Sequence, residues 1–162
     1  MAPGMRRAFP LLVALALIGA DGVAAQSIDT EIAERVAQVQ SATDPGMRID
    51  RAAHLAEYIA SRGPLVVADV EPPVVDDMAE LLEDNADLVR FYAAASLGFL
   101  GPSARRAIPA LEKALERREG ERGIVAGQPK VFTSAVSSEQ AICAALTKID
   151  LSRVPSTCQT FR

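Results

Sequence analysis

Short apolar stripes at helical spacing recur along most of the chain, and they constrain its fold more than any other feature. Ile32, Val36 and Val39 recur at i, i+4 and i+7, the spacing of one face of an α-helix. The same kind of spacing predicts further helices over residues 45–62, 74–84, 87–98, 104–115 and 137–149. Hydrophobic residues make up 49% of the sequence but aromatic residues only 4%. Because Ala, Leu, Val and Ile therefore dominate, the composition favours closely packed helices over a sheet sandwich and predicts an all-α fold.

Proline and glycine divide these stripes. Asp44-Pro45 is typical of an N-cap followed by proline at the first helical position, and Gly63-Pro64 ends the helix that follows. Gly101-Pro102 turns the chain, and Pro109 predicts either a kink or a fresh helix start. Within residues 45–62 the expected inward-facing residues are Ile49, Ala52, Ala53, Ala56, Ile59 and Ala60.

Two segments between the stripes do not have a helical pattern. Residues 65–73 are too short to distinguish a strand from a buried turn, and we interpret them as an extended connection packed on the helices. Residues 119–136 contain three glycines and one proline and predict a loop. Loops of this length in compact domains are often functional or disordered. Ser137 and Gln140 then form a predicted capping box that opens the last helix.

The first 25 residues differ from the rest. Arg6 and Arg7 precede the apolar residues 8–20, and Val23-Ala24-Ala25 closes this run with small residues. This is the layout of a secretory signal peptide. The run is shorter than the ~20 residues that a membrane-spanning helix needs. We therefore expect cleavage near Gln26 and no membrane span afterwards, the alternatives being a retained anchor or a buried helix.

Removal of this segment leaves a mildly acidic chain. Residues 1–25 contribute +1 to the formal net charge of −4, so the remainder carries −5. Nucleic-acid binding usually needs a concentrated basic face, so this class of function is disfavoured. The expected location is the periplasm or the extracellular space.

Cys143 and Cys158 are the only cysteines, and both lie in the part that we expect to be exported. Disulfides persist in such compartments. A bond between them would close a 15-residue separation and join the tail, residues 151–162, to the last helix. Two free thiols are the alternative. A metal site is disfavoured because no histidine or further cysteine stands near them.

The chain also carries a weak internal repeat. Gly63-Pro64 and Gly101-Pro102 are 38 residues apart. At that offset Ala56 aligns with Ala94 and Ile59 with Leu97. Leu146 aligns with Leu97 at a larger offset of 49, which allows for the extra loop residues. A period near 40 built from paired helices indicates an α-solenoid.

Residues 87–115, DLVRFYAAASLGFLGPSARRAIPALEKAL, resemble a short HEAT-like repeat of the type also seen in the phycobilisome-lyase group. The shared pattern is Val89-Arg90, Ala93-Ala94, Leu97-Gly98, Gly101-Pro102 and Ile108-Pro109-Ala110-Leu111. One repeat matches well, helix 74–84 resembles the second helix of the repeat before it, and the flanking repeats match only by spacing. The resemblance implies a small α-α superhelix, a HEAT-like solenoid, over residues 26–162. It also implies that Arg90 is structural, pairs with a nearby acidic group and orders the adjacent turn.

No constellation for catalysis stands out. His54 is the only histidine and lies in the middle of a predicted helix, and no G-x-S-x-G motif offers a nucleophile. Cys143 would be a nucleophile only if it were unpaired and exposed. We expect no catalytic, cofactor-binding or metal-binding residues and no cofactor.

Charged residues form two groups. The first is an acidic cluster on one predicted helix: Asp76, Asp77, Glu80, Glu83 and Asp84. We interpret it as a solvated face, the alternative being a site for a basic partner or a cation. The second interleaves basic residues with Glu112, Glu116 and Glu119, and there we expect ordinary pairs along the helix surface: Arg105, Arg106, Lys113, Arg117 and Arg118.

The sequence therefore predicts an exported, non-enzymatic helical-repeat protein that mediates protein–protein interaction or scaffolding in the cell envelope. The candidate protein-binding residues are Arg90, Tyr92, Lys130 and Phe132. The partner is an unidentified protein. One alternative is an enzyme accessory or lyase-like protein, which the export signal disfavours because that group acts on cytosolic pigment proteins. Another is a self-associating scaffolding factor.

Overall fold

A computed structural model describes residues 27–63, 70–124 and 137–161, with the backbone alone described at 118–124 and 160–161. The predicted signal peptide lies outside the described residues. Within them the chain forms helices and no strand, which confirms the predicted all-α class. The α-helices are α1 (Ile28–Ser41), α2 (Pro45–Arg62), α3 (Pro72–Glu80), α4 (Asp87–Leu100), α5 (Ile108–Ile124) and α6 (Ser138–Ile149). The short 3₁₀ helices are η2 (Leu81–Glu83), η3 (Gly101–Ala107), η4 (Leu151–Arg153) and η5 (Ser156–Phe161).

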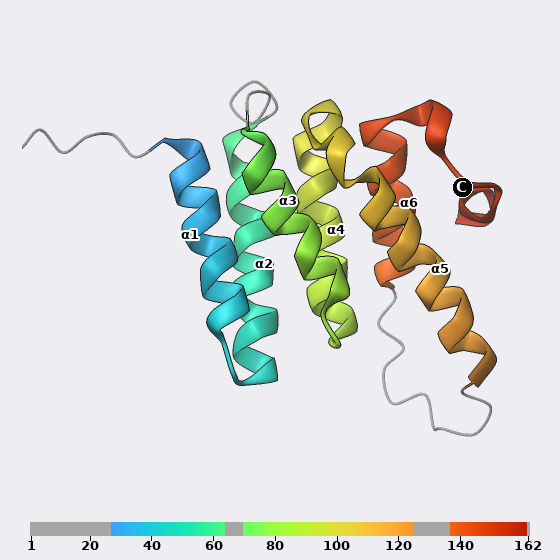
Figure 1. The fold of residues 1–162 in the computed structure, drawn as a ribbon, viewed down its shortest axis with the longest axis horizontal. Helices are drawn as coiled ribbons and strands as arrows, with labels where there is room; N and C mark the ends of the chain where they lie inside the picture. Colours follow the sequence, from blue (N-terminus) through green and yellow to red (C-terminus); the bar gives the residue numbers. More distant parts are fainter. Residues whose placement is uncertain (1–26, 64–69, 125–136, 162) are drawn as a thin grey trace, which may run out of the picture.

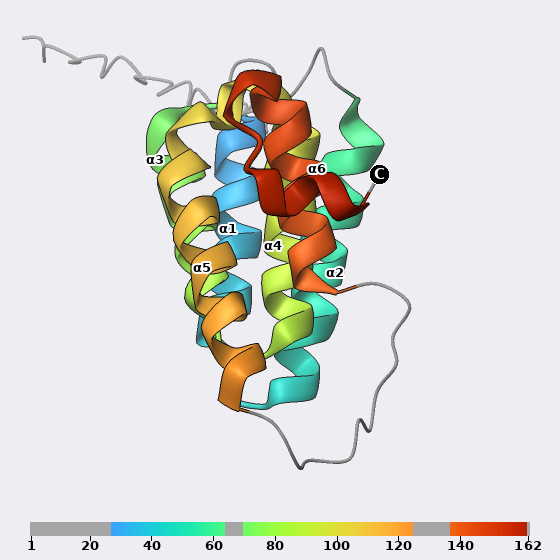
Figure 2. The ribbon, with the colours of Figure 1, turned by 90° about the vertical axis from the view of Figure 1, so that its right-hand side faces the viewer.

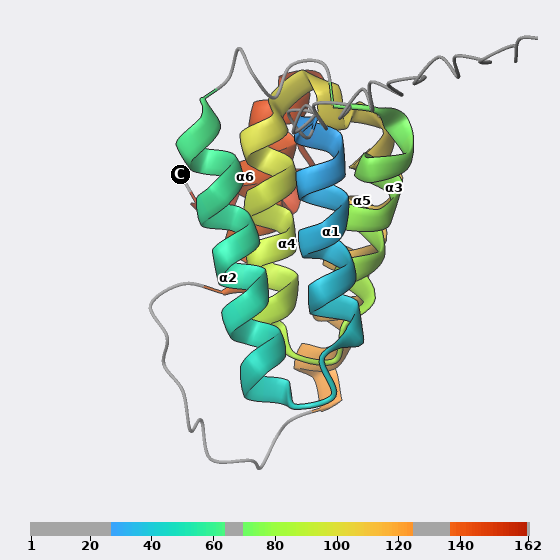
Figure 3. The same cartoon turned by 90° about the vertical axis from the view of Figure 1, so that its left-hand side faces the viewer.

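The helices lie in two layers, and successive helices alternate between them. Figure 2 and Figure 3, taken from opposite ends of the long axis, show α1, α3 and α5 in one layer and α2, α4 and α6 in the other. The pairs α1/α2, α3/α4 and α5/α6 follow one another in chain order (Figure 1). α4 packs most extensively against α6 and then against α2, so it is the central helix of its layer.

The helix ends follow the local chemistry that the sequence indicates. The side chains of Ser27 and Asp44 accept hydrogen bonds from backbone N–H groups in the first turns of α1 and α2. The capping box of Ser137 and Gln140 is present at the start of α6. α2 and α4 both end at a glycine with positive φ, 77° at Gly63 and 56° at Gly101. This backbone conformation favours glycine, and the two ends are therefore equivalent at the 38-residue offset.

Two predicted boundaries are refined. Pro109 lies in the first turn of α5, directly after η3, so it marks a fresh helix start. The predicted loop 119–136 is wrong at its beginning, because α5 continues to Ile124. Glycine costs only about 1 kcal/mol in a helix relative to alanine, so Gly120 and Gly123 do not end α5. Residues 125–136 lie outside the described residues.

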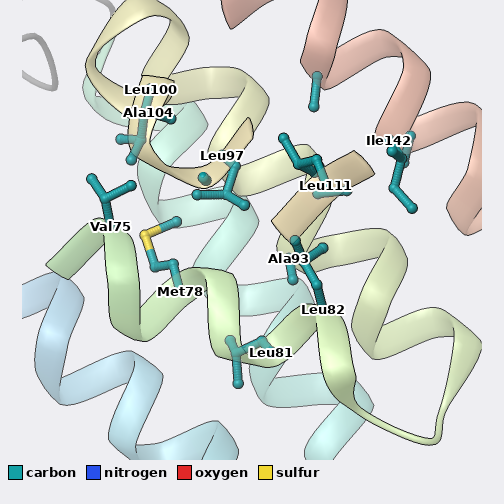
Figure 4. Packing of buried hydrophobic residues seen from close by; sticks show 14 of the residues in the cluster. Val75, Met78, Leu81, Leu82, Ala93, Leu97, Leu100, Ala104, Leu111 and Ile142 are labelled. Carbon is teal, nitrogen blue, oxygen red and sulfur yellow. The ribbon is translucent and has the colours of Figure 1, made fainter. Parts of the chain in front are cut away.

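The core lies between the two layers. The predicted inward stripes are buried in the other five α-helices, and in α2 Ala52, Ala56 and Ile59 are buried while Ile49 and Ala53 are partly buried. Ala60 is an exception, because it is exposed on α2. Figure 4 shows the core where α3 and η2 meet α4, α5 and α6; its labelled residues are Val75, Met78, Leu81, Leu82, Ala93, Leu97, Leu100, Ala104, Leu111 and Ile142.

The predicted disulfide joins Cys143 of α6 to Cys158 of η5, with 5.3 Å between their Cα atoms. Both cysteines are buried. The tail therefore lies against α6, and Arg153 also reaches Glu112 of α5 at 3.5 Å. This arrangement places the tail across the α5/α6 end of the row of helices (Figure 2).

Replacing both cysteines by serine is expected to lower the free energy of unfolding by about 3 kcal/mol, because the unfolded chain loses a cross-link of this loop length. Urea unfolding of the oxidised protein and of the double-serine variant measures this difference. As a control, the oxidised protein in excess reductant should unfold at the same urea concentration as the variant. Equal midpoints for the oxidised protein and the variant would contradict the expectation.

Tyr58 connects α1 to α2. Its hydroxyl donates a hydrogen bond to the Glu31 carboxylate, and the guanidinium carbons of Arg35 and Arg62 lie 4.0 and 4.5 Å from its ring centroid. Burial and the bond to Glu31 together raise the pKa of Tyr58, although Arg62 opposes them.

Because the raised pKa favours the neutral phenol in the folded state, its stabilising effect is complete below pH ~10 and is lost as pH rises through the folded-state pKa. In a Tyr92→Phe variant Tyr58 is the only tyrosine, so phenolate absorbance reports it alone. We expect its titration midpoint to lie above that of the same variant unfolded in urea. A folded-state midpoint at or below the unfolded one would contradict this.

Candidate protein-interaction surface

The outer side of α4, which faces neither α2, α6 nor the other layer, is apolar throughout. Leu88 and Phe99 are 37% and 40% exposed. Phe91, Tyr92 and Ala95 are partly buried between them. Leu88, Tyr92, Ala95 and Phe99 recur at helical spacing, so they form a second apolar stripe beside the buried one. The only charged residues of α4 are Asp87 and Arg90, at its first turn, so no charge interrupts this outer stripe.

A groove separates α4 from α6 on this outer side. It holds a hollow of about 300 Å³, and we define the α4–α6 groove by the residues that line it: Phe91, Ala95, Gly98, Phe99, Gln140, Ala141, Ala144, Ala145 and Lys148. Its floor is made of small residues because the two helices approach closely there. A Cβ atom added to Gly98 would lie 3.1 Å from Ala145 Cα. Two helical turns of α4, or about 12 Å, separate Phe91 from Phe99.

A second hollow adjoins the first toward α2. Its volume is about 220 Å³, and it shares Gly98, Phe99 and Lys148 with the α4–α6 groove. Ile59, Ala60 and Gly63 complete its lining, which explains why Ala60 faces outward. The uncovered surface therefore extends over all three helices of this layer.

Among the residues that the structure describes, Lys148 is the only charged one that lines either hollow. Its Nζ atom lies 4.8 Å from the centroid of the Phe99 ring. Eight other described cations pair with a carboxylate within 4.0 Å, and Lys148 does not do so within the described part of the chain. The surface therefore combines apolar area with a single positive charge.

Two of the four predicted binding residues lie in the described part of the chain, and these two do not share a surface. Tyr92 lies on the outer side of α4, with its ring 5.1 Å from that of Phe91 in an edge-to-face arrangement. Arg90 is 4% exposed and offers a partner almost no surface, so it does not belong to this site. Lys130 and Phe132 lie outside the described residues. Phe91, Phe99 and Lys148 were missed, although the uncharged stripe from Leu88 to Phe99 could have indicated the first two.

Arg90 instead stabilises the turn before α4 through hydrogen bonds. Its Nη1 atom donates to the carbonyl oxygens of Asp84 and Asn85 at 2.8 and 3.2 Å, and Nη2 donates to Asp87 Oδ1 at 3.0 Å. Asp87 Oδ1 also accepts from Ser138 Oγ of α6 at 2.5 Å. The interpretation of Arg90 as a structural residue paired with a neighbouring acid is therefore confirmed.

Arg117 of α5 reaches the same turn. Its guanidinium donates to the carbonyl oxygens of Leu82, Glu83 and Asp84 at 3.3, 3.4 and 3.3 Å. Two arginines from different helices thus supply donors to backbone acceptors at the end of η2, where helical carbonyls lack partners of their own. This arrangement joins α3, α4 and α5 at one end of the bundle.

The acidic cluster on α3 is not simply a solvated face. Asp76 forms a bidentate pair with Arg106, at 3.1 and 2.6 Å, and Glu83 pairs with Lys113 and Arg117 at 2.9 and 3.0 Å. Several cations expected to pair along their own helix therefore pair across to α3 and η2. Hydrogen bonds from Arg106 and from Lys113 lower the pKa of Asp76 and of Glu83 respectively, so both carboxylates stay ionised. Neither is a proton donor near neutral pH.

Comparison of the chain with protein-family models, with curated proteins and with solved structures gives no match. The helices of the described residues include none long and apolar enough to cross a membrane.

Proposed function

We propose that this chain is an exported HEAT-like helical-repeat protein that binds another protein through the outer side of α4 and the α4–α6 groove, without catalysis of its own. The observation that carries the proposal is the uncovered apolar stripe on the central helix. Contiguous apolar patches on monomeric proteins commonly mark interaction sites. The order of helix pairs along the chain and the equivalent glycine ends of α2 and α4 support the repeat assignment.

Export rests on the signal-like residues 1–25, and the disulfide is compatible with an oxidising compartment. Mass measurement of the protein isolated from its source cells tests this part directly. The expected mass is that of a chain beginning near Gln26 and lacking two hydrogen atoms for the Cys143–Cys158 bond. An uncleaved chain with two free thiols would contradict it.

Site-specific photo-crosslinking in intact cells tests the interaction surface. A photoreactive amino acid replaces Ala144, which is exposed and lines the groove, and in a matched control it replaces Ala37, which is exposed on α1. We expect a specific captured protein from position 144 and none from position 37. A captured second copy of the chain would assign the surface to self-association. Absence of any adduct specific to position 144 would refute this location for binding.

Phe99→Ala is expected to weaken that capture at least tenfold, because partly exposed aromatic residues at the centre of an interface carry much of its binding energy. The stability of the variant should change little, since Phe99 is 40% exposed. Adduct yield at position 144 and the urea midpoint measure the two effects. Unchanged capture would show that the partner does not contact Phe99.

A further inference from the structure

We infer that the partner presents an amphipathic helix whose apolar face carries one acidic side chain opposite Lys148. This inference rests on the proposed function, and it names the chemistry of the segment that is bound. Three features of the surface carry it: the polarity of its lining, its continuation on both sides of Lys148, and the charge of Lys148 itself.

The lining favours a helix over an extended peptide. In the α4–α6 groove only Gln140 and Lys148 have polar side chains, and Gln140 Oε1 already accepts from Ser137 N. An extended segment would lay its backbone N–H and C=O groups against alanine, glycine and phenylalanine, where they would lack partners. A helix satisfies these groups internally and presents only side chains, which is how amphipathic helices occupy grooves.

The position of Lys148 determines where along the bound segment the acidic residue must lie. Lys148 and Phe99 stand at the junction of the two hollows, with Ala95 and Ala144 on one side and the exposed Ala60 on the other. A bound segment therefore meets exposed apolar side chains in the α4–α6 groove and, beyond Lys148, the methyl group of Ala60 within a lining that is also partly polar. We expect apolar residues at both ends of its buried face and one Asp or Glu between them.

Lys148 is available for this role. Its only described interaction is the contact with the Phe99 ring, and a cation over an exposed aromatic ring is held weakly. An acidic side chain can recruit the ammonium group while the exposed Phe99 ring packs on the apolar residues beside it. Binding a lysine or arginine at this position would instead place two cations together.

Three displayed peptide libraries test the inference with the purified, oxidised protein. Each library holds helical peptides of about four turns whose apolar-face positions vary among Ala, Val, Leu, Ile and Phe. The central position of that face is Glu in the first library, Gln in the second and Lys in the third. We expect enrichment in the order Glu, Gln, Lys, with the selected Glu peptides binding about fivefold more tightly than their Gln counterparts.

The matched variants are Lys148→Gln and Lys113→Gln, the second on the other layer of helices. Lys148→Gln should abolish the preference for Glu over Gln, and Lys113→Gln should retain it. Equal enrichment of the Glu and Lys libraries would contradict the inference that the partner places an acidic residue opposite Lys148. So would a preference for Glu that survives in Lys148→Gln. If no library is enriched but position 144 gives a specific adduct, the inference that the bound segment is a helix is wrong, and the proposed function stands. Failure of both experiments would reject the surface itself.

Discussion

Replacing Arg90 by methionine is expected to lower the free energy of unfolding by about 2–3 kcal/mol, because backbone carbonyl groups lose a buried charged donor, whereas Asp87 is 35% exposed and stays partly solvated. Methionine keeps much of the apolar stem but removes the donors to Asp84, Asn85 and Asp87. The Asp84 carbonyl retains Arg117, whereas Asn85 loses the donor that Arg90 supplies. Since domains of this size are stable by about 5–15 kcal/mol, the loss is a large fraction of the total. Urea unfolding followed by circular dichroism measures it.

Arg106→Met is the matched control for this experiment. The Arg106–Asp76 pair has similar chemistry, but its side chains are 56% and 50% exposed. Exposed pairs contribute little to stability, so the urea midpoint of the control should hardly move. A loss of stability in Arg106→Met as large as that in Arg90→Met would show that burial of the guanidinium is not what makes Arg90 matter.

Replacing Gly98 by leucine is expected to cost about 3 kcal/mol, because α4 and α6 touch at this position. An added Cβ would lie 3.1 and 3.3 Å from Ala145 Cα and Cβ, which is closer than a Cβ normally approaches a neighbouring helix backbone. The helices must separate or the side chain must leave its preferred rotamer, and overpacking of this kind costs about 1–3 kcal/mol or more. The shift of the urea midpoint measures the effect.

Ala95→Leu is the control on the same helix. Ala95 lines the open groove, so a larger side chain there meets solvent instead of a neighbouring backbone. We expect stability to be retained while the partly filled groove loses capture at position 144. If Ala95→Leu destabilised the protein as much as Gly98→Leu, the cost would be general to α4 and would not reflect the contact with Ala145.

Much of the fold was predictable because it depends on local chemistry. Helix ends depend on individual residues, such as the Asp44 cap and the glycines that adopt positive φ at Gly63 and Gly101. The disulfide followed from there being only two cysteines. The inward stripes followed from helical spacing, because a one-residue change in phase would bury polar side chains.

The pairing of charges was not predictable from the order of residues. Asp76 and Arg106 are 30 positions apart, and each also has nearer neighbours of opposite sign in the sequence. Only the packing of η3 and α5 beside α3 decides which pairs form. Lys148 could not be predicted as a site residue for the same reason. Its position depends on the Phe99 ring, which lies beneath it in the fold but 49 positions earlier in the sequence.

The uncovered outer side of α4 could not be predicted from the sequence for a different reason. Its inward stripe, including Val89, Ala93 and Leu97, already accounted for a buried face, so the remaining apolar residues could be assigned to contacts with adjacent helices. The structure shows that α2 and α6 cover the flanks of α4 and leave Phe99 and Leu88 open. Which apolar residues stay uncovered depends on how many helices pack against a given helix. The spacing of apolar residues in the sequence does not determine how many do so.

The disulfide-bonded tail has a consequence for growth of the architecture. Stacked helix pairs can in principle lengthen by adding another pair at either end, and the surface that such an addition would use beside α5 and α6 is occupied by η4 and η5. Residues 151–161 therefore cover this end of the row of helices, and the Cys143–Cys158 bond holds them there. Where thiols stay reduced, that end would depend on noncovalent contacts alone to resist end-to-end polymerisation.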